Sequence, residues 1–230
     1  MIIRASQPPL IALDPGEFLF LFEKDMTVEL QKLRHDLYFV HAAVLQCGRK
    51  AFMLVGESGS GKSTTTWALL HHGYGYWSDE LAPVDLQTLE IYPYPHALCL
   101  KGVPPAAYPP PKSTLYTSRS LHIPTVTLPS VVGHAPAPVV AIFFVHYWPE
   151  TLTPIVQPMS KATAVARLLA NALNPLAHAA DGLDGAITLG TSVASFDLTA
   201  ADLTATCALV NATLQGLIET AADRTLLGTP

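Results

Sequence analysis

The sequence predicts an α/β fold, and a pattern in the first third of the chain carries the prediction. Two apolar stretches rich in β-forming residues, 37–46 and 51–56, are separated by a short polar turn and predict a pair of strands. Residues 62–72 have the length of a helix that ends at Gly73, and residues 74–78 are typical of a short aromatic strand. The order strand, strand, helix, strand indicates a sheet covered by helices.

The segments on either side of this core have different patterns. Residues 17–30 cluster β-forming side chains, which predicts a β-rich segment ahead of the core. Residues 92–120 contain a large share of the 20 prolines and show no helical period, so we expect them to be extended or loop-like. A loop of this length in a compact domain is usually either functional or disordered.

The C-terminal half predicts one strand and two helices. Residues 137–148 are typical of a buried strand. Residues 160–173 show the pattern of an amphipathic helix, with Ser160 as N-cap and an Asn-Pro pair just past the end. Residues 199–221 predict a final helix with Thr199 as its cap, and we assign no element after Asp223.

Length and composition favour one domain. The chain has 230 residues, of which 50% are hydrophobic, so it can bury one sizeable core and needs no second domain. We divide this single domain as follows: a β-rich N-terminal segment, 1–39; a nucleotide-binding core, 40–100; a proline-rich acceptor-loop region, 101–138; and C-terminal strands and helices, 139–222.

Charge and cysteine content exclude several classes of protein. Only 13% of residues are charged and the formal net charge is −5, so we expect no general binding to nucleic acid or to an anionic membrane. The three cysteines, Cys47, Cys99 and Cys207, match neither a disulfide framework nor a paired metal-ligand spacing. The strongest apolar run, 139–148, is too short to span a bilayer. We therefore expect a soluble, cytoplasmic protein.

A glycine-rich stretch between the strand at 51–56 and the helix at 62–72 matches the phosphate-loop pattern G-x-x-x-x-G-K-[ST]. Its glycines allow the backbone N–H groups to point inward around phosphate oxygens at a helix N-terminus. We expect Lys62 to reach the terminal phosphates of ATP and the Ser63 hydroxyl to coordinate Mg²⁺. The predicted nucleotide-binding residues are Gly56, Glu57, Ser58, Gly59, Ser60, Gly61, Lys62, Ser63 and Thr64.

The acid pair Asp79 and Glu80 narrows the class of phosphate-loop protein. It follows the loop after room for one helix, a turn and one strand, so it should lie near the phosphates, where an acid can bind Mg²⁺ or accept a proton. The motifs of switch GTPases and of transporter ATPases are missing from the sequence. The pair therefore indicates phosphoryl transfer to a hydroxyl group. Upstream, His41 interrupts an apolar strand, and a structural and a catalytic role both stay open for it.

Three ordered stretches, "HAAVL" at 41–45, "GESGSGKSTT" at 56–65 and "WSDE" at 77–80, resemble the HPr kinase/phosphorylase-like kinases. The catalytic domain of that family is a phosphate-loop variant related in fold to phosphoenolpyruvate carboxykinase, which implies a mixed central sheet with flanking helices. The resemblance covers residues 40–214 and is closest up to Pro83. The sequence also resembles shorter HPr kinase-related proteins, including those found with peptide-modification genes.

The resemblance also implies roles for the site residues. His41 corresponds to a histidine that orients the catalytic acid, Asp79 to the general base and Glu80 to a metal helper, although the family commonly has a second aspartate there. It implies a kinase for a peptide or protein serine, such as a lasso-type precursor peptide. The sequence shows neither the separate N-terminal domain nor the phosphorolysis region of the full-length family, so reverse phosphorylase activity is not inferred.

The proline-rich middle offers cations for the acceptor side of the site. One of Lys101, Lys112 and Arg119 could neutralise the transferring phosphoryl group, since catalysis of this reaction is mainly positioning and electrostatics. Lys101 is preferred because it follows the apolar run 97–100 and should project from a strand end. Arg119 comes second, and Arg167, on a late helix, is expected to be structural.

Two other classes stay open. A kinase for a small hydroxyl metabolite, such as free serine, also places an acid after the second strand, but such enzymes usually carry an arginine-rich lid that is missing here. A non-catalytic regulator would bind the nucleotide without transferring phosphate. The sequence leaves open whether ATP, GTP or pyrophosphate is the donor, and whether the chain forms a homo-oligomer.

Overall fold

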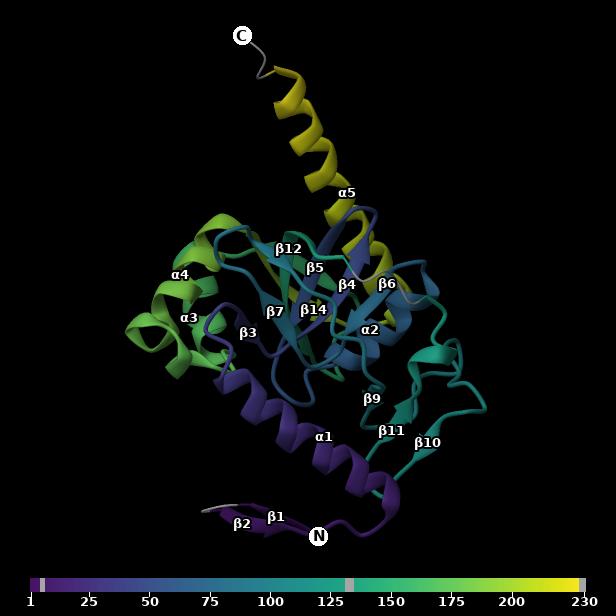
Figure 1. Cartoon of the computed structure of the whole chain (residues 1–230). Helices are drawn as coiled ribbons and strands as arrows, with labels where there is room; N and C mark the ends of the chain where they lie inside the picture. The colour runs from purple at the N-terminus through teal and green to yellow at the C-terminus, as the bar shows by residue number, and fades with distance from the viewer. Residues whose placement is uncertain (5–6, 131–134, 228–230) are drawn as a thin grey trace.

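The computed structural model describes residues 1–4, 7–130 and 135–227, and it shows a mixed α/β architecture built on one curled sheet of nine strands (Figure 1). Seven strands are hydrogen-bonded in the order β3-β7-β8-β12-β5-β4-β6. The strand β14 pairs with β12, and β13 pairs with the other side of β14. These strands are β3 (Tyr38–Val40), β4 (Ala42–Cys47), β5 (Lys50–Val55), β6 (Gly75–Ser78), β7 (Ala82–Val84), β8 (Glu90–Ile91), β12 (Ala137–Tyr147), β13 (Ile155–Pro158) and β14 (Ala194–Ala200).

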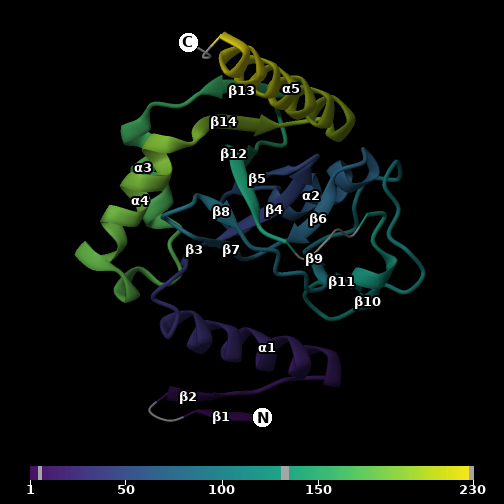
Figure 2. The same ribbon diagram turned by 45° about the horizontal axis from the view of Figure 1, so that its top comes forward.

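Helices and two small sheets surround the central sheet (Figures 1 and 2). The helices are α1 (Pro15–Lys32), α2 (Lys62–His71), α3 (Lys161–Ala170), α4 (Leu183–Ser192) and α5 (Leu203–Leu227), with 3₁₀ turns at Thr125–Thr127, Pro175–Ala177 and Ala179–Gly182. The small sheets are the hairpin of β1 (Ile2–Arg4) with β2 (Gln7–Leu10), and a three-stranded sheet of β9 (Leu98–Leu100), β11 (Leu121–Ile123) and β10 (Leu115–Tyr116).

Parallel and antiparallel pairs meet at β5 and β12 in the centre of the sheet. The strands β4 and β5 form an antiparallel hairpin, whereas β12 runs parallel to β5 on one side and to β14 on the other. The carboxyl ends of β5, β12 and β14 therefore lie at the same edge of the sheet. In α/β sheets this edge is where ligands usually bind.

Alternating side chains of the central strands build two cores, one on each face of the sheet. On β5, Phe52 and Leu54 pack with α2 and α5, while Met53 and Val55 pack with α3 and α4. Such strands are buried on both faces and appear in sequence as continuous apolar runs. This explains why the sequence predicted these strands well.

The predicted β-rich segment over 1–39 is wrong for residues 15–32, which form helix α1. The side chain of Asp14 caps this helix by accepting a hydrogen bond from the Glu17 N–H at 2.8 Å, and Pro15 occupies its first turn. These start signals override the β-forming propensity of the phenylalanines that follow. Helix α1 runs along one side of the body, with the β1–β2 hairpin on its outer side (Figures 1 and 2).

The C-terminal predictions hold in part. Ser160 caps α3, as expected, with its Oγ accepting from the Thr163 N–H at 3.1 Å. The predicted cap at Thr199 is wrong, since that residue belongs to β14 and the Asp202 carboxylate accepts from the Ala205 N–H at the start of α5. The sequence also missed α4 and β14. Both elements are short and flanked by small residues, so no strong periodicity marked them.

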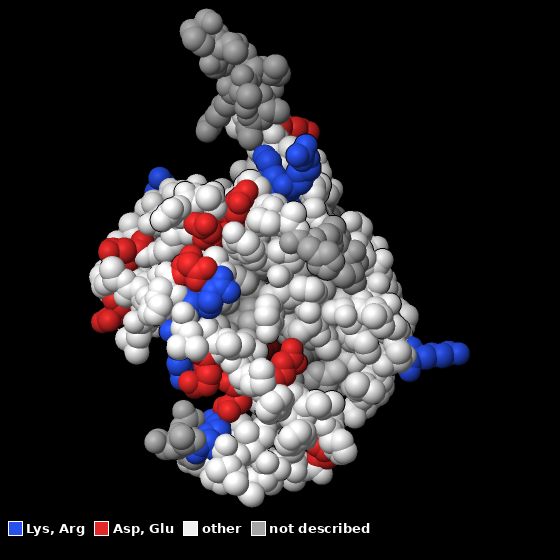
Figure 3. All heavy atoms as spheres, in the orientation of Figure 1, with Lys and Arg blue, Asp and Glu red and all other residues white. Residues whose placement is uncertain are grey.

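The surface agrees with the low charge content. On the face shown in Figure 3, acidic and basic side chains are sparse and interspersed, and no large basic area is visible. Within the described ranges, no helix is both long enough and apolar enough to cross a membrane.

Burial lowers the pKa of His41, His71 and His122, which predicts how stability varies with pH. A histidine with a lowered folded-state pKa stabilises the fold above its unfolded pKa, and this contribution is lost as the pH falls, because the unfolded chain then binds more protons. We expect the thermal midpoint to fall between about pH 7.5 and pH 5.5, and to fall less in a His122→Gln variant. An equal pH dependence in the two proteins, measured by calorimetry, would contradict this.

Candidate functional site

The glycine loop 56–61 connects β5 to the first turn of α2. Gly59 and Gly61 have φ angles of 93° and 88°, in the left-handed region that favours glycine. A Cβ atom on Gly56 would lie 2.5 Å from Ser60 Oγ and 2.9 Å from the Val145 carbonyl oxygen. The loop conformation therefore depends on glycine at these positions.

The geometry of the loop is compatible with bound phosphate oxygens. Helix α2 begins at Lys62, so its N-terminus directs partial positive charge toward the loop. The Oγ atom of Ser60 is buried and has no hydrogen-bond partner within the described residues. Phosphate oxygens would supply acceptors for such a donor, and the open space around Gly59 leaves room for them.

Lys62 connects the loop to the acid pair. Its side chain is 7% exposed, and Nζ donates a hydrogen bond to the main-chain carbonyl of Asp79 at 3.5 Å. The structure thus brings together the phosphate-loop lysine and the end of β6, as the spacing in the sequence predicted. Ser63 and Thr64 follow in the first turn of α2.

The Asp79 side chain is fully buried behind the site. Its Oδ2 accepts a hydrogen bond from the Cys99 N–H at 3.1 Å, and its Oδ1 has no partner within the described residues. Burial raises the pKa of this carboxyl, while the positive charge of Lys62 opposes that shift. Asp79 is fully buried and is not among the residues that line the adjacent cavity.

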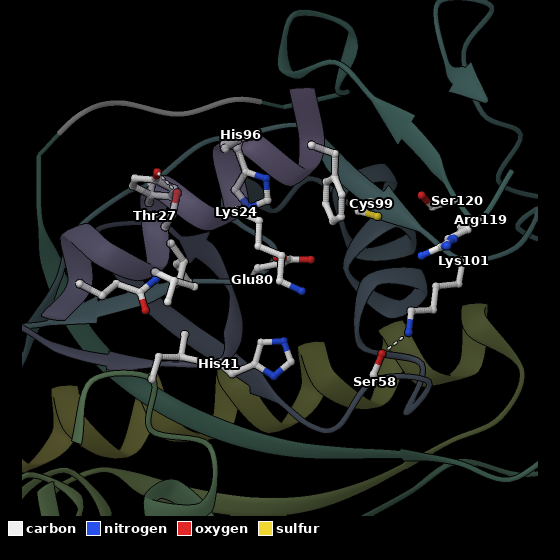
Figure 4. Close-up of a pocket in the computed structure, with 17 residues that line it drawn as sticks. Lys24, Thr27, His41, Ser58, Glu80, His96, Cys99, Lys101, Arg119 and Ser120 are labelled. Carbon is white, nitrogen blue, oxygen red and sulfur yellow. Dashed lines mark hydrogen bonds between the residues drawn. The ribbon is translucent and has the colours of Figure 1, made fainter. Parts of the chain in front are cut away.

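A cavity of about 500 Å³ adjoins the loop, and Glu80 faces it (Figure 4). Its walls come from α1, the start of β4, the glycine loop, the end of β6 and the β9–β11 sheet. Figure 4 shows the side chains of Glu80 and His41 pointing into the same space, with Ser58 and Lys101 at one side. The cavity therefore places a carboxylate, an imidazole and a cation around one volume beside the phosphate loop.

His41 lies at a break between two strands that the sequence predicted as one. Its N–H donates to the Asn171 carbonyl at 2.8 Å, so the main chain leaves β3 and turns into β4 at this residue. Burial, and next the charge of Lys62, lower the pKa of His41, which keeps the ring neutral near pH 7. Within the described part of the chain its ring forms no hydrogen bond with Asp79, so the expected orienting contact is not formed.

The three cations of the proline-rich region are placed differently. Lys101 directly follows β9, and its Nζ donates to Ser58 Oγ in the glycine loop. Arg119 also lines the cavity, and its Nε lies 3.6 Å from Oε1 of Glu17 on α1. Lys112 is exposed and lies outside the cavity lining. Of these three cations, Lys101 is the one that the described residues show hydrogen-bonded to the glycine loop.

Helix α1 supplies a wall of the cavity that sequence reasoning missed. Lys24 extends from α1 into the cavity toward the region of Glu80 and His41, and Thr27 and Gln31 line it one and two turns further along (Figure 4). With α1 taken for a β-rich segment, no pattern in the sequence pointed to these residues. Lys24 is a third cation in the cavity lining, beside Lys101 and Arg119, and it was not among the candidates that the sequence offered.

Arg167 is bound within a separate cluster at the ends of β12 and β14. Its Nη1 donates to Asp197 Oδ1 at 2.7 Å, the guanidinium lies 5.6 Å from the Phe144 ring centroid, and His146 Nε2 lies 3.1 Å from the same carboxylate oxygen. These contacts agree with the structural role expected for Arg167.

The described residues contain no group of three or more His, Cys, Asp and Glu side chains arranged to bind a metal. Mg²⁺ in kinases is usually bound by one or two protein oxygens together with phosphates and water. Ser63 and the acid pair are oxygen donors of this kind, and the unpaired Oδ1 of buried Asp79 fits such a ligand set. The donor chemistry is thus compatible with Mg²⁺.

No protein-family model matches the chain, and no similar protein was found among curated sequences. Among solved structures, the chain is similar to the HPr(Ser) kinase/phosphatase from Coxiella burnetii. The two chains are 12% identical, the match covers 80% of this chain and 98% of the other, and the TM-score is 0.39. The function is therefore argued from the residues of the site itself.

Proposed function

We propose that the protein is an ATP- and Mg²⁺-dependent kinase that transfers the γ-phosphoryl group to a hydroxyl, with a serine of a peptide or protein as the acceptor. One observation carries the proposal: a single cavity adjoins both the phosphate loop, through Ser58 and Lys101, and a carboxylate, Glu80. Phosphoryl transfer needs a phosphate site and a proton acceptor around the same volume. In this proposal residues 1–230 form one phosphate-loop domain of the HPr kinase and phosphoenolpyruvate carboxykinase type.

The glycine loop and the residues after it would bind the nucleotide. The main-chain N–H groups of Gly56 through Gly61, with Lys62, would hold the phosphates, and Ser63 and Thr64 would complete the site at the start of α2. Bound Mg²⁺ would neutralise charge on the phosphate oxygens. Lys62 is already held between the loop and Asp79, so its ammonium group needs little reorganisation to meet the phosphates.

Within the acid pair, we propose roles opposite to those that the sequence suggested. A general base must come within hydrogen-bond reach of the acceptor hydroxyl. Glu80 lines the cavity in which we place that hydroxyl, whereas Asp79 is fully buried and outside the lining. Glu80 would accept the hydroxyl proton as the acceptor oxygen bonds to the γ phosphorus and the bond to the β–γ bridging oxygen breaks. Asp79 would position Lys62 and offer its unpaired oxygen to Mg²⁺.

The remaining cavity residues would set charge and geometry around the transfer. The neutral ring of His41 can donate or accept a hydrogen bond next to Glu80, which suits a positioning role. Lys101 beside Ser58, and Lys24 on α1, would offset the negative charge of the transferring group.

A phosphotransfer assay tests the proposal. We would incubate the protein with ATP and Mg²⁺ and a panel of acceptors, namely free serine, serine-containing peptides and HPr, and record masses. We expect one acceptor to gain one phosphoryl group, and the gain to disappear when EDTA removes Mg²⁺. Transfer to free serine alone would instead identify a metabolite kinase, and ATP binding without any transfer would identify a regulator.

A further inference from the structure

A second cavity lies beneath α1 and adjoins the first. Its volume is about 380 Å³, and its walls come from the C-terminal half of α1, from β3 and β7, and from the segment between β8 and β9. Thr27, Gln31, Leu81 and Tyr94 line both cavities. The Oγ1 of Thr27 and the hydroxyl of Tyr94 are hydrogen-bonded to each other at 3.2 Å. The two spaces are therefore neighbouring parts of one region under α1.

The second cavity has a different chemistry from the first. Apart from the shared residues, its lining is mostly apolar or aromatic: Leu30, Leu33, Leu37, Phe39, Pro83, Tyr92 and Pro93. The one charged residue in the lining, Arg34, donates two hydrogen bonds to the Asp36 carboxylate at 2.7 Å, so its charge is already paired. A concave space with this lining suits an apolar group.

Gln31 is a buried polar side chain on the wall shared by the two cavities. It is 4% exposed, and its side-chain amide forms no hydrogen bond within the part of the chain that the structure describes, although its main-chain carbonyl accepts from Asn174 Nδ2 at 3.3 Å. A carboxamide both donates and accepts hydrogen bonds, as a peptide group does. Gln31 is therefore suited to bind an amide of a ligand that passes between the cavities.

We propose that the second cavity is a subsite for a large apolar side chain of the acceptor, and that Gln31 binds an amide between this side chain and the reacting hydroxyl. The inference rests on the proposed function, because that function places the hydroxyl at Glu80 in the first cavity. A free hydroxylated amino acid would occupy the first cavity only. The acceptor is thus a peptide segment in which a serine is accompanied by a nearby residue such as leucine, isoleucine or phenylalanine.

Two substitutions on α1 separate the subsite from general effects on the helix. Leu30 is 55% exposed and lines the second cavity only, so Leu30→Trp should fill that cavity without disturbing the buried cores. Leu19 is 65% exposed on the same helix and lines neither cavity, so Leu19→Trp is the matched control. Gln31→Met removes the amide while preserving the length of the side chain.

Calorimetric binding of non-reacting peptides tests the subsite directly. We would use short peptides in which alanine replaces the serine, as pairs that carry leucine or glycine at a neighbouring position on either side. We expect one leucine peptide to bind the native protein about tenfold more tightly than its glycine partner. This preference should vanish in Leu30→Trp, persist in Leu19→Trp and weaken in Gln31→Met. Equal or undetectable binding of each pair to the native protein, or a preference that survives in Leu30→Trp, would overturn the proposal.

Serine versions of the same peptides, supplied with ATP and Mg²⁺, distinguish a failure of the subsite proposal from a failure of the kinase proposal. If the leucine preference in binding is found but no peptide is phosphorylated, the subsite stands and the kinase proposal fails. If a peptide or metabolite is phosphorylated without any leucine preference in binding or rate, the kinase stands and the subsite proposal fails.

Discussion

Lys62→Ala is expected to abolish phosphoryl transfer and to weaken the binding of ATP. In the fold, Lys62 is almost fully buried, lies at the start of α2 and donates to the Asp79 carbonyl, so its ammonium group is fixed at the edge of the phosphate loop. Removing a fixed charge that stabilises the transferring phosphoryl group should lower the rate by on the order of a thousandfold. The rate of transfer and the affinity for ATP, measured by calorimetry, are the readouts.

Two further variants control for folding. Lys62→Met retains most of the buried side chain and removes only the charge, so it should be as inactive as Lys62→Ala while keeping the native thermal midpoint. Lys161→Met removes an exposed charge at the start of α3, away from the cavity lining, and should leave transfer unchanged. Appreciable transfer by Lys62→Met would show that the glycine loop does not act as a phosphate site.

Glu80→Gln is expected to lower the transfer rate by about a hundredfold or more and to leave the affinity for ATP close to native. The substitution preserves the shape of the side chain in the cavity but removes the group that accepts the proton. Asp79→Asn should act differently, because Asp79 lies behind the site beside Lys62 and offers an unpaired oxygen. We expect it to raise the Mg²⁺ concentration needed for half-maximal transfer.

The comparison of the two variants decides the assignment of roles. If Asp79→Asn loses turnover at every Mg²⁺ concentration while Glu80→Gln stays fully active, the base is Asp79, as the family resemblance of the sequence implied. Equal losses in both, with weakened ATP binding, would indicate that the pair acts jointly on the metal.

The sequence predicted the strand, glycine loop and helix around Lys62 because the relevant information is local. The glycine spacing, the apolar run of β5 and the helix after Lys62 lie within one continuous stretch, and the positive φ angles of Gly59 and Gly61 explain why glycine stands there. The acid pair was predicted to lie near the loop, and the contact between Lys62 and the Asp79 carbonyl agrees with this.

The roles within the acid pair could not be predicted from the sequence. Asp79 and Glu80 are neighbours at the end of β6, and the chain direction there decides which carboxylate enters the cavity and which is buried against Cys99. Spacing along the chain is the same for both to within one residue. Only the three-dimensional path of the chain separates the buried acid from the one that faces the cavity.

The wall that α1 contributes to the cavities could not be predicted from the sequence for a different reason. The phenylalanines of α1 favour strands in isolation but lie in a capped helix here. The cavities under α1 are closed by segments that lie far apart in the chain, from Thr27 on α1 to Tyr94 and Lys101. Neither Lys24 nor Gln31 belongs to a recognisable motif, so the structure was needed to bring them to the site.

The most direct test of the account follows the γ-phosphoryl group itself. We would supply ATP labelled at the γ phosphorus, with Mg²⁺ and serine-containing peptides, to the native protein and to Glu80→Gln and Lys62→Met in parallel, and measure the label on the peptides. We expect the native protein to transfer label to a peptide, and we expect both variants to transfer much less. Label that stays on ATP with the native protein across the whole panel, or that reaches a peptide equally well with Lys62→Met, would contradict the account.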